Sequence, residues 1–296
     1  MAGQLKEVRN RIKSVQSTQQ ITKAMKMVSA AKLRRAQDAI TQMRPYANKL
    51  QDMLSNIVSN TEGGSAGAEL STERTVEKVL LIVITSDRGL CGGYNANIAK
   101  LAKLTIDEKY TDHLKKGNVA IWGIGKKGVE YFQRRGYKVN VDHRDVLHQI
   151  SFANVQNVAE AAVNAFINKE FDVIELVYSK FKNAATQVFT VERYLPIPKT
   201  VETTGSKLAK ADFIFEPAMD ELIAVLMPKI LNTQLFKAVL DGNASEHGAR
   251  MTAMDKASEN AEDLIKTLKI SYNRARQAAI TTELTEIVSG AAALEG

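Results

Sequence analysis

The chain contains few cysteine, tryptophan and proline residues. It has one cysteine, Cys91, one tryptophan and five prolines among its 296 residues. A single cysteine excludes an internal disulfide and any zinc site built from several thiolates. The most hydrophobic run, Val79–Thr85, is far shorter than the roughly 18 uncharged apolar residues that a membrane-spanning helix needs. Disulfide-stapled, zinc-ribbon and membrane-spanning classes are therefore excluded.

The chain has enough apolar residues for a packed core, and its charge is unevenly distributed. Apolar residues make up 45% and charged residues 25%, which is typical of a soluble globular protein. The N-terminus has no apolar stretch and carries Glu7, so we expect neither a secretory signal nor a transit peptide. The net charge is +7, yet residues 1–60 alone carry eleven Lys and Arg against three acidic residues. Such a segment indicates a solvated helix face or a surface for an acidic partner.

Nucleic acid is a second possible partner for this basic segment. Phosphate-backbone binding needs only positive charge, and that alternative stays open. However, Tyr46 is the only aromatic residue in the segment, and no helix-turn-helix or zinc-finger pattern accompanies it. A protein partner is favoured.

Residues 3–59 have the pattern of one long helix. Apolar residues recur by alternating threes and fours, as in a heptad seam, in two runs that share one register: Leu5, Val8, Ile12 and Val15, then Leu33, Ala36, Ile40, Met43, Ala47, Leu50, Leu54 and Ile57. Between the runs the seam positions are polar: Gln19, Thr22, Lys26 and Ser29. There the apolar stripe moves to Ile21, Met25 and Val28 on a rotated face. We expect a continuous helix of about 85 Å that changes neighbours at this point.

After a Gly- and Ser-rich linker at 61–67, strand-like and helix-like stretches alternate. Strands are predicted at 79–85, 118–122, 138–141, 172–179 and 187–194, and helices at 95–109, 127–135 and 155–168. Near-continuous β-branched runs separated by helices indicate buried, mostly parallel strands. We therefore expect a doubly wound, Rossmann-like α/β domain over residues 76–200.

Helical patterning returns at about residue 217 and runs almost to the C-terminus, giving a third segment at 212–296. A second three-four seam consists of Met254, Ala257, Ala261, Leu264, Leu268, Ser271, Ala275 and Ala278. From Ile280 the stripe shifts to Leu284, Ile287 and Ala291. Two seams at opposite ends of one chain can bury each other, so we predict an antiparallel coiled coil. The alternative is two separate helices on the domain surface, but 85 Å exceeds the diameter of so small a domain.

Two motifs raise the possibility of an enzyme. Gly123–Gly128 matches G-x-G-x-x-G between a strand and a helix, with Asp142 near the end of the next strand, as in a dinucleotide site. However, the motif follows the second strand of the domain, and any doubly wound sheet needs such turns. Cys91 lies in a turn after the first strand and could be a nucleophile, although packing is favoured because no histidine spacing supports it. Neither a G-x-x-x-x-G-K-[S/T] loop nor paired metal-ligand histidines occur.

Three long segments resemble the γ subunit family of F-type ATP synthases. These are Arg11–Ala36, Thr85–Asn95, which reads TSDRGLCGGYN, and Tyr272–Ala291. The last contains Ile280-Thr-x-Glu283-x-x-Glu286 followed by Gly290-Ala291, the family's C-terminal signature. The resemblance covers the whole length and order of the chain.

The resemblance implies a rotor without a catalytic site of its own. In the family the two terminal helices form an asymmetric antiparallel coiled coil inside a ring of three α and three β subunits. The α/β domain forms a foot with the ε subunit on the membrane c-ring. One copy per complex couples ion-driven c-ring rotation to ATP synthesis or hydrolysis on β. We accordingly expect no cofactor, no metal and no nucleic acid, and an indirect, peripheral association with the cytoplasmic side of a bacterial inner membrane.

The resemblance also assigns contact residues. Those expected to contact or couple to the α and β subunits are Lys23, Met25, Lys26, Arg250, Arg276, Gln277, Thr281, Glu283 and Glu286. Those expected at the foot, against ε and the c-ring, are Phe213 and Glu216, although Phe213 replaces a tyrosine found in some members. No second thiol is present for light-linked redox control. The alternative interpretation is an NAD(P)-dependent oxidoreductase with helical arms for oligomerisation.

Overall fold

The computed structural model describes residues 2–60, 68–197 and 219–295. Two long helices, α1 (Ala2–Asn60) and α7 (Met219–Glu295), lie at the ends of the chain. The chain divides into two compact units, Met1–Ser29 with Met251–Gly296, and Ala30–Arg250, so both helices contribute to both units. Among the described helices, none has the length and hydrophobicity to span a bilayer.

The second unit contains one five-stranded sheet in the order β3-β2-β1-β4-β5. Its strands are β1 (Val79–Ile84), β2 (Val119–Ile124), β3 (Lys138–Asn140), β4 (Val173–Phe181) and β5 (Gln187–Leu195). The first four are parallel, and β5 pairs antiparallel with β4. Every residue of β1 and β2 is buried, as expected for strands covered on both faces. The prediction of a doubly wound, mostly parallel α/β domain is confirmed.

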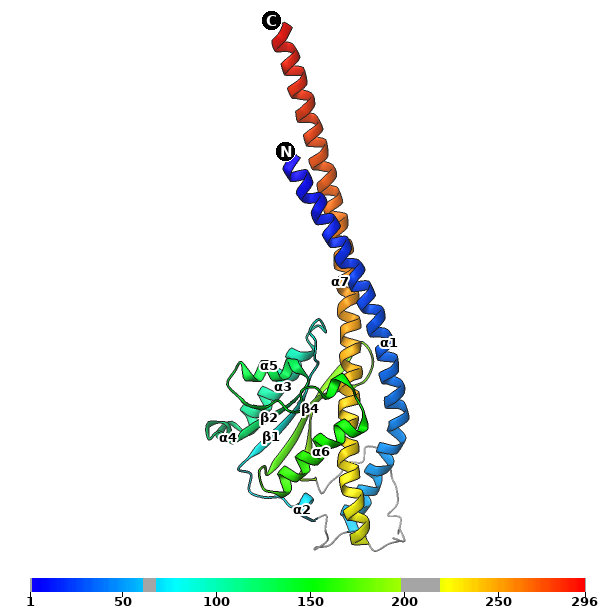
Figure 1. The fold of residues 1–296 in the computed structure, drawn as a ribbon, viewed down its shortest axis with the longest axis vertical. Helices are drawn as coiled ribbons and strands as arrows, with labels where there is room; N and C mark the ends of the chain where they lie inside the picture. Colours follow the sequence, from blue (N-terminus) through cyan, green and yellow to red (C-terminus); the bar gives the residue numbers. More distant parts are fainter. Residues whose placement is uncertain (1, 61–67, 198–218, 296) are drawn as a thin grey trace. The chain divides into compact units, whose positions relative to one another are not determined.

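Helices cover both faces of this sheet (Figure 1). Helices α3 (Tyr94–Lys109) and α5 (Lys126–Gln133) contribute to one apolar cluster, and α6 (Phe152–Ile167) and the middle of α7 contribute to the other. Each of these helices lies within about two or three residues of its predicted bounds. Three short elements were not predicted, because one turn is too short to show a hydrophobic period: α2 (Ala68–Ser71), α4 (Thr111–Lys115) and η1 (Val146–His148).

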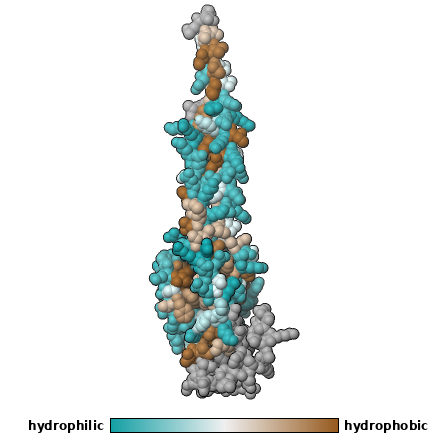
Figure 2. Space-filling view, turned by 90° about the vertical axis from the view of Figure 1, so that its right-hand side faces the viewer, coloured by the Kyte–Doolittle hydropathy of each residue, from teal (hydrophilic) through white to brown (hydrophobic). Residues whose placement is uncertain are grey.

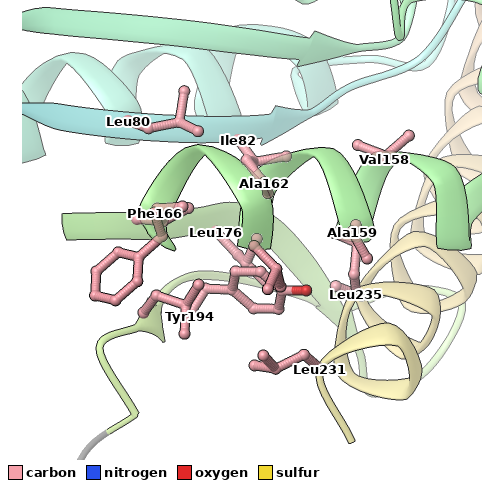
Figure 3. Packing of buried hydrophobic residues seen from close by; sticks show 14 of the residues in the cluster. Leu80, Ile82, Val158, Ala159, Ala162, Phe166, Leu176, Tyr194, Leu231 and Leu235 are labelled. Carbon is pink, nitrogen blue, oxygen red and sulfur yellow. The ribbon is translucent and has the colours of Figure 1, made fainter. Parts of the chain in front are cut away.

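The middle of α7 is part of the core of the α/β unit. Leu231 and Leu235 pack under the sheet together with α6, next to Tyr194 of β5 (Figure 3). Further along, the Gly242 carbonyl accepts a hydrogen bond of 2.8 Å from the hydroxyl of Tyr94 on α3. A Cβ at Gly242 would lie 3.2 Å from the Ile84 side chain, so glycine permits this close approach.

The other unit is an antiparallel pair of helices. Thr22 Oγ1 of α1 lies 2.7 Å from Ser258 Oγ of α7, and four residues further along α1 Lys26 forms an ion pair with Asp255. Residue numbers thus rise on one helix as they fall on the other. The buried stripe of α7 in this unit is Met254, Ser258, Ala261, Ile265 and Leu268.

This stripe corrects two positions of the predicted α7 seam. Ser258 and Ile265 are buried in place of the expected Ala257 and Leu264, and Leu264 is 39% exposed. Apolar character alone could not decide, because Leu264 and Ile265 are adjacent and equally hydrophobic. The polar Ser258 takes the inward position because its hydroxyl has a partner, Thr22, across the interface.

The predicted change of neighbour in the middle of α1 is also corrected. The polar seam positions Thr22 and Ser29 stay buried, while Ile21 and Val28 on the rotated face are each 57% exposed. Burial of these hydroxyls is tolerated because each is hydrogen-bonded, Thr22 to Ser258 and Ser29 to the Met25 carbonyl. On the rotated apolar face, Ile21 and Val28 are therefore mostly exposed, whereas Met25 is half-buried.

Two buried tyrosines of the α/β unit provide a matched stability test. The Tyr178 hydroxyl donates to Glu192 Oε2 at 2.7 Å, whereas the buried Tyr194 hydroxyl has no hydrogen-bond partner in the described part of the chain. We predict that Tyr178→Phe lowers the free energy of unfolding by about 1–2 kcal/mol, and that Tyr194→Phe leaves it unchanged or raises it. Denaturant unfolding of the two variants measures this; equal losses would show that Tyr194 has a partner.

Candidate functional site

The candidate contact residues lie on three separate stretches of the chain. Lys23, Met25 and Lys26 lie on α1, five others lie towards the C-terminal end of α7, and Arg250 lies in the α/β unit. Phe213 and Glu216 lie outside the described residues. The candidate residues therefore form separate stretches along helices, and these stretches differ in composition and exposure.

The α1 stretch combines positive charge with exposed apolar side chains. Lys23 is exposed, and Met25 is half-buried. Lys26 is tied to Asp255 of α7, with about two fifths of each side chain exposed. Ile21, Met27 and Val28 expose 57–67% of their surface around these residues. We call Ile21, Lys23, Met27 and Val28 the outer α1 face. Lys23 is the charged residue of this face, and none of the described ion pairs includes it. Sequence reasoning missed Met27, because it lies neither on the seam nor on the rotated stripe.

The C-terminal end of α7 is an exposed helix with an apolar stripe. Ile280, Leu284, Ile287 and Val288 are 48–67% exposed, and Figure 2 shows hydrophobic side chains gathered towards this end. Sequence reasoning missed Val288, which lies one residue from the stripe. The predicted contact residues on this stretch are all exposed as well: Arg276, Gln277, Thr281, Glu283 and Glu286.

The antiparallel register explains why this stripe is exposed. Since Thr22 meets Ser258 and Lys26 meets Asp255, Ile280 lies about level with the first residue of α1. Helix α7 continues to Glu295, so about its last 15 residues, some 22 Å, extend beyond the start of α1 (Figure 1). The stripe shift seen in the sequence at Ile280 therefore marks the point where α7 leaves its partner.

Arg250 is enclosed within the α/β unit. It is 9% exposed and forms an ion pair with Glu246, one turn earlier on α7. Its Nη2 donates to the carbonyl oxygens of Arg88 at 3.0 Å and Gly89 at 3.2 Å, in the loop after β1. Burial raises the pKa of Glu246, and the adjacent Arg250 charge opposes that rise. Burial also lowers the pKa of His247 to about 4, an effect that the positive charge of Arg250 reinforces.

The glycine motif is used for packing. The N–H groups of Lys126, Lys127 and Gly128 at the start of α5 donate to Asp87 Oδ1 at 3.1 Å, the Ser86 carbonyl at 3.0 Å and Thr85 Oγ1 at 2.8 Å. In a dinucleotide site, N–H groups at this helix end bind the pyrophosphate. Here the segment after β1 occupies them.

The glycines themselves are required by that contact. Gly125 has φ +97°, and a Cβ on it would lie 2.4 Å from the Thr85 carbonyl oxygen. A Cβ on Gly128 would lie 2.7 Å from Thr85 Oγ1. Asp142, the proposed ribose acid, is exposed. The dinucleotide interpretation therefore loses its geometric basis.

Cys91 has a structural environment. It is 1% exposed, and its sulfur lies 3.3 Å from Asn95 Nδ2 and 3.8 Å from Ser86 Oγ. No histidine is among its contacts in the described structure, which agrees with the packing role favoured from the sequence. Within the described ranges, no cluster of three or more His, Cys, Asp or Glu side chains could hold a metal ion.

The structure defines a class of protein with an α/β domain whose flanking helices also pair as an antiparallel coiled coil. A family model described as ATP synthase matches residues 4–294. The ATP synthase gamma chain of Cytophaga hutchinsonii is 49% identical over 291 residues, 98% of each chain. That of Flavobacterium johnsoniae is 50% identical over 293 residues, 99% of each chain. The chain therefore belongs to the ATP synthase gamma chain family.

Solved structures share this fold at lower sequence identity. A chain in the Euglena gracilis mitochondrial ATP synthase, in a structure of OSCP, F1 and c-ring, aligns with a TM-score of 0.66 at 19% identity, covering 99% of this chain and 95% of that one. A chain from the central stalk and c-ring structure of the Tetrahymena thermophila enzyme aligns with a TM-score of 0.56 at 22% identity, covering 80% and 99%. The predicted fold class is thereby confirmed.

The packing role of the glycine motif can be tested by substitution. Gly125→Ala adds a methyl group against the Thr85 carbonyl at a positive φ, so we predict a loss of about 3 kcal/mol or more in the free energy of unfolding. Gly117→Ala is the matched control, because Gly117 has φ +73° with no atom within 4 Å of the added Cβ. For Gly117→Ala the free energy of unfolding should fall by only about 1–2 kcal/mol, the cost of a positive φ for a residue with a Cβ. Equal losses for the two variants would contradict the packing role.

Proposed function

We propose that this chain is the central rotor of an F-type ATP synthase, carrying rotation of a membrane c-ring to the nucleotide sites of the β subunits. The observation that carries the proposal is the end of α7, where a bare helix extends beyond its partner with an exposed apolar stripe. Such a stripe is costly in water and is typical of a binding surface. A collar of surrounding subunits would cover it as a bearing.

The coiled-coil unit is suited to treat three identical partners differently. The outer α1 face presents Lys23 among exposed apolar side chains, whereas the end of α7 presents an apolar stripe flanked by Glu283 and Glu286. A shaft with unlike sides makes different contacts with each β subunit in turn. Because a contact shifts a conformational equilibrium only by its differential affinity, rotation would change the nucleotide affinity of each site in sequence.

The proposal leaves the ATP chemistry to the β subunits. The occupied N–H groups at the start of α5 support this, because they remove the phosphate site that the sequence suggested. No cofactor, metal or nucleic acid has a role in the proposal. We further propose that the chain is peripheral on the cytoplasmic side of the membrane, one copy per complex, held through the c-ring. Phe213 and Glu216 would contact ε and the c-ring there.

Charge reversal on α1 tests this function, and the two lysines are expected to differ. Lys23→Glu reverses the free charge of the outer α1 face, so in the reconstituted complex we predict less ATP-driven proton pumping per ATP hydrolysed. Its effect on stability should stay within about 0.5 kcal/mol, since Lys23 is exposed. Lys26→Glu replaces the ion pair with Asp255 by two like charges, so it should also lower the melting temperature of the complex.

Proton pumping into vesicles, measured together with ATP hydrolysis, gives the coupling ratio. Lys103→Glu is the matched control, because Lys103 is an exposed lysine on α3 outside the proposed surfaces. A complex assembled without the chain should not pump at all. Unchanged pumping without the chain would overturn the proposed function, and an unchanged ratio for Lys23→Glu would overturn the role of the outer α1 face.

A further inference from the structure

A carboxylate is buried where α1 lies against α7 within the α/β unit. Asp241 of α7 is 5% exposed and lines a crevice with Lys237 and Leu240 of the same helix. The other side of the crevice is formed by four residues of α1, which we call the α1 seat: Ile40, Met43, Arg44 and Ala47. The volume of the crevice is about 10 Å³, which is room for about one water molecule. The crevice therefore hydrates an ionised carboxylate poorly.

Asp241 has fewer polar partners than a neighbouring carboxylate. Glu192 of β5 accepts a hydrogen bond of 2.7 Å from the Tyr178 hydroxyl, and the Lys180 ammonium lies 3.6 Å from the same carboxylate. Asp241 accepts a hydrogen bond from the main-chain N–H of Phe181. None of the ion pairs in the described part of the chain includes Asp241. Its ionised form is therefore less well stabilised than that of Glu192.

Three cations and one tyrosine face Asp241 from the elements packed around it. The cations are Arg44 of α1, Lys237 of α7 and Lys180 of β4, and the tyrosine is Tyr178 of β4. Burial raises the pKa of Asp241 from 3.8 to about 6, although the three cations oppose the rise. The folded chain thus keeps a proton that the unfolded chain releases. The stability that this proton contributes is present at low pH and is lost as the pH rises through about 6.

We propose that Asp241 makes the attachment of α1 sensitive to protons: the neutral side chain holds the α1 seat against α7, and the ionised side chain loosens it. Movement of the seat away from α7 admits water to the carboxylate, so ionisation favours this opening. Elsewhere in the unit α1 is attached by apolar residues, among them Leu33, Ala36 and Leu50, which are buried and do not titrate. The opening is therefore local. The proposal concerns the chain itself and does not rest on the proposed function.

Hydrogen exchange followed by mass spectrometry measures this opening in the full-length chain. After correction for the intrinsic pH dependence of exchange, the protection of the amides of residues 40–47 should fall about tenfold between about pH 5 and pH 7.5. That change is expected if opening returns the pKa of Asp241 from about 6 to 3.8. The amides of α6 are the internal reference, and their protection should change by less than about twofold.

Two variants separate Asp241 from the other titrating groups of the unit. Asp241→Asn cannot ionise, so the protection of the α1 seat should be the same at both pH values. Its melting temperature minus that of the wild type should also be more positive at pH 7.5 than at pH 5. This difference cancels the contributions of Glu246 and His247, whose pKa values burial also shifts. Asp112→Asn, at an exposed aspartate of α4, is the matched control and should keep the wild-type fall.

Two results would overturn the proposal. One is a fall in the protection of the wild-type α1 seat of less than about threefold, where the linkage predicts about tenfold. The other is a fall that persists in Asp241→Asn. If Asp241→Asn does not fold, Asp241→Ala carries the same test, because it leaves no polar group of this side chain in the crevice. The wild-type measurement still decides whether the seat responds to pH.

Discussion

The structure depends on a buried polar contact between two paired helices. The hydroxyls of Thr22 and Ser258 meet across the α1–α7 interface, and Lys26 pairs with Asp255 one turn away. Apolar residues along a heptad seam would allow neighbouring registers of similar energy, whereas a buried hydroxyl pair loses its partner if the helices slip. These contacts therefore fix the register. The register in turn sets how much of α7 extends beyond α1, which is the feature on which the functional proposal rests.

In the α/β unit, too, polar groups are hydrogen-bonded to other groups of the same chain. The N–H groups at the start of α5 are satisfied by Asp87, Ser86 and Thr85, and the Arg88 and Gly89 carbonyls after β1 accept hydrogen bonds from Arg250. The N–H groups that would bind a nucleotide in an enzyme of similar topology are thus hydrogen-bonded within the chain. The candidate functional surfaces are accordingly exposed helix faces, which suits a protein that acts by contact with its neighbours.

The sequence was sufficient to predict the architecture. Buried strands such as β1 are runs of β-branched and leucine residues, and helices such as α6 show a clear period, so their positions were predicted within a few residues. The heptad seams predicted the antiparallel pair. What periodicity could not decide was the choice between adjacent apolar positions, Leu264 and Ile265, because that choice depends on the Thr22–Ser258 contact. It likewise could not show that polar seam positions remain buried.

The candidate site was predicted less completely, for a related reason. Residue type and resemblance identified Lys26 and Arg250 as contact residues, but sequence does not show which charges are paired within the chain. Asp255 and Glu246, their partners, carry no separate signal. The exposed residues Arg276 and Glu283 are placed as a partner contact requires, and their roles stay predictions.

The most direct test of the account is a covalent link across the helix pair in the assembled complex. In a Cys91→Ala background, Thr22→Cys and Ser258→Cys place two thiols where hydroxyls now lie 2.7 Å apart, so mild oxidation should form a disulfide. If the two helices turn as one shaft, ATP-driven proton pumping should persist in the oxidised complex at the level of the reduced one. Failure of the disulfide to form, or a loss of pumping that a reductant reverses, would contradict the account.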